Sequence, residues 1–256
     1  MLLNARRSYA AELYRQLARR GIRAAGLNYR SCSGELNRTN RFYNAGATED
    51  VALTLDWLAA TFPRAPIGAT GVSLGANMLL KYMGEMGESS RVRAGVAVSP
   101  PFDLLLGAGA LERGYGRIYV PRFIRSLRQK VLAKADELSG LVDVARIDEV
   151  RTIRQFDDWF TAPLHGYRDA DDYYRRNSSA QFLPDIAAPT LLIRADDDPF
   201  FDNADIPYRA IDRNPNLQAA FVTHGGHVGF MAGSLHAPLW WAETQAARFL
   251  AQRLLI

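Results

Sequence analysis

The chain has 256 residues, of which 48% are hydrophobic and 23% are charged. This composition is typical of a globular protein and is sufficient for one α/β domain over residues 1–256. No apolar run reaches the length of a membrane span, and the N-terminus lacks the apolar stretch of a signal peptide. We therefore expect a cytoplasmic protein without a membrane insertion. The single cysteine, Cys32, excludes an internal disulfide.

The formal net charge is +4, and arginine is the main basic residue. Arginines are spread along the whole chain, and acidic residues are interspersed with them. No Lys/Arg run or basic-aromatic ladder stands out, so the charge indicates an Arg-rich surface and not a nucleic-acid partner.

Helices and strands alternate over the first hundred residues. The pattern predicts a helix at Ser8–Arg20, a short buried strand at Ile22–Leu27, a helix at about 47–60, a strand at Pro66–Thr70, a helix from Gly75 to about Met86, and a strand at Val92–Val98. Such an alternation favours a mainly parallel sheet with helices on both faces.

The alternation stops after Phe102. Residues from about 103 to 183 contain helical patterns without a convincing strand, at Leu111–Ala135, Arg154–Phe160 and Asp169–Arg176. Two further strands and a last helix follow, at Thr190–Arg194, Leu217–Thr223 and Pro238–Leu254. We interpret residues 103–183 as a helical cap inserted over the carboxyl edge of the sheet. Its aromatic residues are candidates for lining a pocket: Tyr115, Tyr119, Phe123, Trp159 and Phe160.

Gly71-Val72-Ser73-Leu74-Gly75 fits the pattern G-x-S-x-G and lies between a predicted strand and a predicted helix. A sharp turn in this place lifts the serine above the sheet, and small residues on either side let strand and helix approach closely. The helix N-terminus also favours a developing oxyanion. We therefore predict Ser73 as a nucleophile and the Leu74 N–H as an oxyanion donor.

A serine nucleophile needs a base, and a histidine after the last strand is typical of this arrangement. Two histidines fit, His224 and His227, and we favour His227 because the two preceding glycines let its loop turn over the strand ends. His165 and His236 are expected to be structural or solvated.

The third residue should be an acid after the preceding strand. Asp196, Asp197 and Asp198 all follow that strand. The usual spacing from the strand end favours Asp198, and Asp197 is the alternative. The acid would accept the His227 ring N–H and stabilise the imidazolium.

These stretches together resemble the YheT-type hydrolases of the α/β-hydrolase superfamily, which are assigned as esterases. The matching segments run from near the N-terminus almost to the end: 27–34, 46–50, 71–79, 101–104, 197–200 and 224–230. The resemblance implies an α/β-hydrolase fold and carboxylic-ester hydrolysis of a small acyl ester. It also implies a Ser73, Asp198 and His227 triad, with no cofactor and no metal.

The family normally begins with further strands and a His-Gly loop that supplies a second oxyanion N–H. Ser8-Tyr9 already matches the start of the helix that follows this loop. We therefore expect the N-terminal strands to be missing, which would leave a sheet edge or an apolar face open. Two alternatives to the esterase stay open, a catalytically impaired or non-catalytic protein of the same fold, and an acyltransferase or thioesterase with the same triad.

Overall fold

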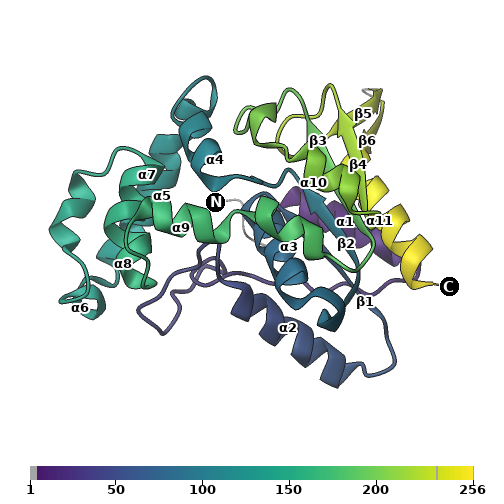
Figure 1. Ribbon diagram of the computed structural model, residues 1–256, viewed down its shortest axis with the longest axis horizontal. Coiled ribbons are helices and arrows are strands. Elements are labelled where there is room, and N and C mark those ends of the chain that lie inside the picture. Colours follow the sequence, from purple (N-terminus) through teal and green to yellow (C-terminus); the bar gives the residue numbers. More distant parts are fainter. Residues whose placement is uncertain (1–4, 235, 256) are drawn as a thin grey trace.

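The computed structural model describes residues 5–234 and 236–255. At its centre lies a sheet of four parallel strands in the spatial order β1-β2-β3-β4 (Figure 1). The strands span Ile67–Val72 (β1), Val92–Val98 (β2), Thr190–Ala195 (β3) and Leu217–Val222 (β4). Val72 pairs with Val98, and Ala195 pairs with Val222. The carboxyl ends of the strands therefore meet at one edge of the sheet.

Helices cover both faces of this sheet, as Figure 1 shows. One face carries α1 (Ser8–Ala18) and α11 (Trp241–Leu254), and the other carries α2 (Thr48–Thr61), α3 (Leu74–Met86) and α10 (Tyr208–Arg213). Side chains of β2 alternate between the two cores: Val96 and Val98 pack with α11, whereas Ala97 packs with α3. Burial on both faces explains why the strands are continuously apolar.

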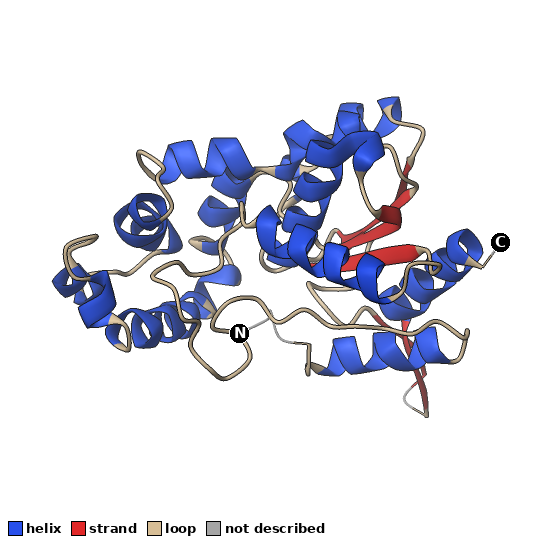
Figure 2. Cartoon of the chain, turned by 90° about the horizontal axis from the view of Figure 1, so that it is seen from below, coloured by secondary structure: helices blue, strands red, loops and turns tan. Residues whose placement is uncertain are grey.

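Between β2 and β3 the chain forms a helical lobe, residues 104–185, which extends to one side of the sheet (Figure 2). It contains α4 (Leu104–Leu111), α5 (Val120–Leu132), α6 (Ala135–Leu138), α7 (Ile153–Phe156), α8 (Ala162–Leu164) and α9 (Ala170–Asn177), with a π-helical turn at Asp157–Thr161. Short 3₁₀ turns occur at Gly116–Ile118, Val144–Asp148 and Ser179–Asp185. The lobe has an apolar core of its own.

Asn77 fastens α3 to the end of the lobe. Its side-chain nitrogen donates to the Asn177 carbonyl at 2.9 Å, and its side-chain oxygen accepts from the Ser179 N–H at 2.9 Å. Asn77 is fully buried, and a buried amide with both groups paired fixes its neighbours in one arrangement. The helix that begins beside Ser73 is thus tied to the lobe.

Three predictions of local structure are wrong. Residues 22–27 are extended but form no strand, because no described segment lies beside them and makes the backbone hydrogen bonds of a sheet. The predicted helix 111–135 begins only at Val120, since Gly114 adopts φ +53° and breaks the preceding turn. The last helix begins at Trp241, because Ala237–Trp240 (β6) pairs antiparallel with Met231–Ser234 (β5).

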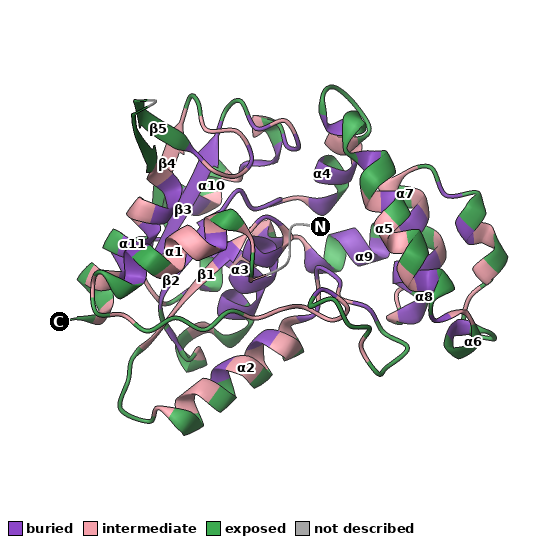
Figure 3. Ribbon diagram, turned by 180° about the vertical axis from the view of Figure 1, so that it is seen from behind, coloured by how far each residue is buried: buried purple, intermediate pink, exposed green. Residues whose placement is uncertain are grey.

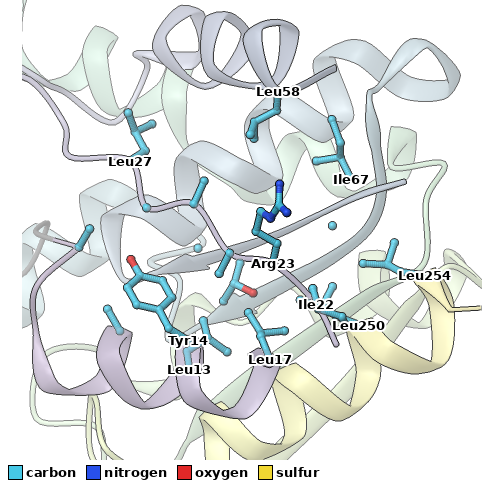
Figure 4. Close-up of a pocket in the computed structure, with 18 of the residues that line it drawn as sticks. Leu13, Tyr14, Leu17, Ile22, Arg23, Leu27, Leu58, Ile67, Leu250 and Leu254 are labelled. Carbon is cyan, nitrogen blue, oxygen red and sulfur yellow. The ribbon is translucent and has the colours of Figure 1, made fainter. Parts of the chain in front are cut away.

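An apolar groove of about 840 Å³ lies beside β1, on the side away from β2. Figure 4 shows the side chains around it, from α1, α2, α11 and the extended residues 22–27: Leu13, Leu17, Ile22, Leu58, Leu250 and Leu254. Within the described residues, no strand pairs with β1 on this side.

Glu243 lies in the first turn of α11 and is buried, and within the described residues its Oε2 has no hydrogen-bond partner. Burial raises the pKa of Glu243 from 4.5 to about 7. Between about pH 4.5 and pH 7, the Glu243 carboxyl therefore keeps its proton in the native protein and has released it in the unfolded chain. This stabilising contribution is fully present below about pH 4.5 and is lost as the pH rises through about 7.

We therefore expect Glu243→Gln, which cannot ionise, to gain stability relative to the wild type as the pH rises. Between about pH 5 and pH 8, the difference in free energy of unfolding should shift by about 2 kcal/mol in favour of the variant. Urea unfolding at both pH values measures it. Glu149→Gln, at an exposed glutamate, is the control and should show no such shift. A Glu243→Gln difference that is equal at both pH values would contradict the assignment.

Candidate active site

Ser73 occupies a strained turn between β1 and α3. Its backbone has φ 56° and ψ −127°, in a region that residues other than glycine rarely adopt. The Ser73 N–H donates to the Val98 carbonyl at 2.8 Å, and the Ser73 carbonyl accepts from the Ala76 N–H at 2.8 Å. The end of β2 and the first turn of α3 therefore hold the strained residue in place.

Gly71 makes the close approach of β1 and α3 possible. A Cβ on Gly71 would overlap the Gly75 carbonyl oxygen and would lie 2.6 Å from the Ala76 Cα. Both neighbours are backbone atoms, which cannot rotate away. Only glycine fits here, which is the physical reason for this residue in the G-x-S-x-G pattern.

The Leu74 N–H lies at the N-terminus of α3, beside the Ser73 side chain. Within the described residues, no acceptor pairs with this N–H. An unpaired N–H at the positive end of a helix of 13 residues is suited to a developing negative charge. The structure therefore leaves the predicted oxyanion donor available.

His227 lies between Ser73 and Asp198. Its Nε2 is 2.9 Å from the Ser73 Oγ, and its Nδ1 is 2.8 Å from the Asp198 Oδ2. All three residues are buried. Because an ionised carboxylate only accepts hydrogen bonds, His227 donates from Nδ1, and its Nε2 can accept from the serine hydroxyl. The structure thus brings together the three residues that the sequence names.

Two aromatic rings hold the His227 imidazole. The Phe200 and Phe201 rings lie 4.4 Å and 5.3 Å from it, measured between centroids. Phe200 also fixes the acid, since its N–H donates to the Asp198 Oδ1 at 2.8 Å. The loop after β3 thus contributes both the acid and the walls around the base.

Asp197, the alternative acid, has different partners. Its Oδ1 accepts from the Gly225 and Gly226 N–H groups, at 2.8 Å and 2.7 Å. These hydrogen bonds, that of Gly226 foremost, lower the pKa of Asp197. His224 is largely exposed, and its Nδ1 lies 3.4 Å from the Asp197 Oδ2. Asp197 therefore fastens the loop that carries His227.

Arg194 and Asp205 form a buried ion pair below this site, which the sequence reasoning missed. The Arg194 Nη2 is 2.8 Å from the Asp205 Oδ1, and Nη1 donates to the Pro100 carbonyl at 2.8 Å. The Asp205 Oδ2 also accepts from the Phe102 N–H. The pair joins the loop after β3, which carries Asp198 and is called the acid loop below, to the segment after β2. The signal was present in the sequence, since Arg194 is the one charged residue in the strand predicted at 190–194.

A cavity of about 470 Å³ opens above Ser73. Its walls come from the acid loop and from helices of the lobe, with apolar residues in the majority, among them Leu74, Leu104, Leu111, Phe123, Phe156 and Phe200. Asp157 also lines it, but Thr161 and Tyr174 both donate to its carboxylate, and burial raises its pKa to about 6. The cavity wall is therefore mostly apolar, and its charged lining residues are Asp157, Arg122 and Arg125.

The remaining candidates lie elsewhere. Phe123 lines the cavity, whereas Tyr115, Tyr119, Trp159 and Phe160 are not among its lining residues. His165 Nδ1 pairs with the Asn44 side chain at 3.0 Å, and burial lowers its pKa to about 4. His236 is exposed in the connection of the β5–β6 hairpin. These two histidines have structural or solvated surroundings.

In the described ranges 5–234 and 236–255, no cluster of three or more His, Cys, Asp or Glu side chains could hold a metal ion. Within the same ranges, no helix combines the length and the apolar character that a membrane crossing requires.

Comparison with known proteins gives relatives over nearly the whole chain. A family model for the alpha/beta hydrolase fold matches residues 4–234. The chain is 40% identical to the protein YheT of Escherichia coli (strain K12), an assigned esterase, over 96% of this chain and 73% of the relative. It is 31% identical to a monoacylglycerol lipase of Saccharomyces cerevisiae over 96% of this chain and 56% of the relative. For the phospholipase ABHD3 of Mus musculus the identity is 31%, over 83% of this chain and 52% of the relative.

The chain thus spans about half the length of the last two relatives. Among solved structures, an esterase of Pyrococcus furiosus, Pf2001, superposes with a TM-score of 0.60 at 16% identity and covers 98% of this chain and 79% of that one. This likeness concerns the fold. The resemblance to YheT-type hydrolases is confirmed, and the chain belongs to the α/β-hydrolase family, among relatives of the esterase and lipase type.

Proposed function

We propose that this chain is a serine hydrolase that cleaves carboxylic esters of an apolar acyl group. The hydrogen-bonded series from Ser73 through His227 to Asp198 carries the proposal. The apolar cavity above Ser73 supports the choice of substrate, because a cavity of about 470 Å³ has room for an acyl chain.

In this mechanism the Ser73 Oγ attacks the ester carbonyl carbon while the His227 Nε2 takes the hydroxyl proton. The carbonyl oxygen becomes an oxyanion beside the Leu74 N–H. The tetrahedral intermediate then collapses, and the alcohol leaves with the proton from His227. A water molecule, deprotonated by His227, attacks the acyl-enzyme and releases the acid. Asp198 holds the ring in the required tautomer and stabilises the imidazolium.

The helical lobe acts in this proposal as a cap on the single α/β-hydrolase domain. Residues from α4, α5 and α7 line the cavity together with Ser73, among them Leu104, Phe123 and Phe156. These residues would contact the acyl chain. The bond between Asn77 and the 177–179 segment would keep the cap in place relative to the nucleophile.

Ser73→Ala should abolish ester hydrolysis. We expect the chain to hydrolyse p-nitrophenyl butyrate, with kcat/KM at least about 10³-fold lower in the variant, since the nucleophile is lost. Circular dichroism should show an unchanged fold. Equal turnover by wild type and variant would show that the hydrolysis does not use Ser73.

Asp198→Asn and Asp197→Asn separate the two candidate acids. The amide that Asp198→Asn introduces would favour the wrong imidazole tautomer, so we expect kcat to fall by about 10³–10⁴-fold. The amide that Asp197→Asn introduces keeps an oxygen acceptor for the Gly225 and Gly226 N–H groups, so kcat should fall by less than about 10-fold. Steady-state kinetics on the same ester measures both. The reverse order of the two losses would assign the role to Asp197.

A further inference from the structure

Three exposed apolar side chains lie close together between α4 and α5. We call residues 112–119 the α4–α5 tip. Within it Tyr115 is 78% exposed, Ile118 is 70% exposed and Tyr119 is 42% exposed. Figure 3 shows the loop beyond α4 as an exposed end of the helical lobe. Exposed apolar residues gathered in one short segment, and not scattered singly, are typical of a contact surface.

Arginines without an acidic partner surround these side chains. The segment from Leu104 to Ala135 contains seven basic residues and a single acidic one, Glu112. Five of its arginines are exposed, and one of them, Arg128, pairs with Asp148. The other four form no ion pair within the described residues: Arg113, Arg117, Arg122 and Arg125. The tip, with Arg113 and Arg117, and the start of α5, with Arg122 and Arg125, therefore present positive charge that no carboxylate pairs within the described residues.

The tip lies next to the candidate active site. The Tyr119 ring packs edge-on against Phe200 at 4.9 Å, and Phe200 in turn lies 4.4 Å from the His227 ring. Arg122 and Arg125 line the same cavity as Ser73. The tip thus lies one aromatic ring, Phe200, away from His227, and the helix that follows the tip carries two arginines that line the acyl cavity.

We propose that the α4–α5 tip docks on an anionic lipid bilayer. Its aromatic rings and Ile118 enter the headgroup region, and the surrounding arginines bind lipid phosphates. Nucleic acid would match the arginines, but it offers no apolar phase to Ile118. The bilayer satisfies both properties of the surface. Delivery of a lipid acyl ester into the cavity additionally rests on the proposed function, whereas docking itself does not.

The test is sedimentation of the wild-type chain with vesicles of phosphatidylcholine, alone or mixed with phosphatidylglycerol. We expect binding to the mixed vesicles and much weaker binding to phosphatidylcholine alone. Ile118→Ser and the double variant Arg113→Gln/Arg117→Gln should each weaken binding to the mixed vesicles by at least about 10-fold. Leu53→Ser is the matched control, because Leu53 on α2 is also 70% exposed. It should bind as the wild type does.

Hydrolysis of soluble p-nitrophenyl butyrate by the tip variants separates the two proposals. It should be unchanged, since Arg113, Arg117 and Ile118 do not line the acyl cavity. If the wild type cleaves no ester, the proposed function is refuted. If the wild type still binds mixed vesicles and the tip variants do not, docking is supported all the same. Failure of the wild type to bind mixed vesicles, or equal binding by Ile118→Ser and Leu53→Ser, would overturn docking. Binding to an oligonucleotide but to neither vesicle would assign the tip to nucleic acid instead.

Discussion

The imidazole of His227 is the point on which the candidate site depends. One ring nitrogen lies 2.9 Å from the Ser73 Oγ and the other lies 2.8 Å from the Asp198 Oδ2. The three residues follow three different strands, β1, β3 and β4. Both hydrogen bonds therefore require the carboxyl ends of these strands to stop at the same level, which the parallel sheet provides. A shift of one strand by a single residue would move one partner by about 3 Å and break a bond.

Burial makes this arrangement costly unless the surrounding polar groups are paired. Asp198 is buried, but its second oxygen accepts from the Phe200 N–H, and the Arg194 guanidinium lies 4.0 Å away. Arg194 is itself held by Asp205 and by backbone carbonyls. A buried ion pair of this kind adds little net stability, yet loss of one partner leaves an uncompensated charge. Its role here is to hold the acid loop against the end of β2.

The local features of the site could be predicted from the sequence because neighbouring residues determine them. Gly71 and Ser73 specify the turn by steric exclusion, and the order of strands along the chain points to His227 and Asp198. The hydrogen bonds of Asp197 with the N–H groups of Gly225 and Gly226 could not be foreseen, since the choice between adjacent aspartates depends on where a distant loop passes. The charge of Arg194 within an apolar strand indicated a buried partner, but which carboxylate pairs with it depends on where the chain passes after β3.

The wrong predictions of local structure also have physical causes. Residues 22–27 have the composition of a strand, but a strand exists only where a neighbour supplies hydrogen bonds, and none of the described residues does so here. The β5–β6 hairpin replaces the start of the predicted last helix because pairing with Met231–Ser234 outweighs the local preference of residues 237–240. Which aromatic residues face the cavity was equally a matter of tertiary packing, and Phe123 alone of the five candidates does so.

In the proposed mechanism, His227 activates Ser73 as a nucleophile. Reaction with a fluorophosphonate, followed by peptide mapping in the mass spectrometer, tests it without reference to any particular substrate. We expect one adduct, on Ser73, that forms far more slowly in His227→Ala. No adduct, an adduct on another residue, or labelling of Ser73 at the same rate in His227→Ala would contradict it.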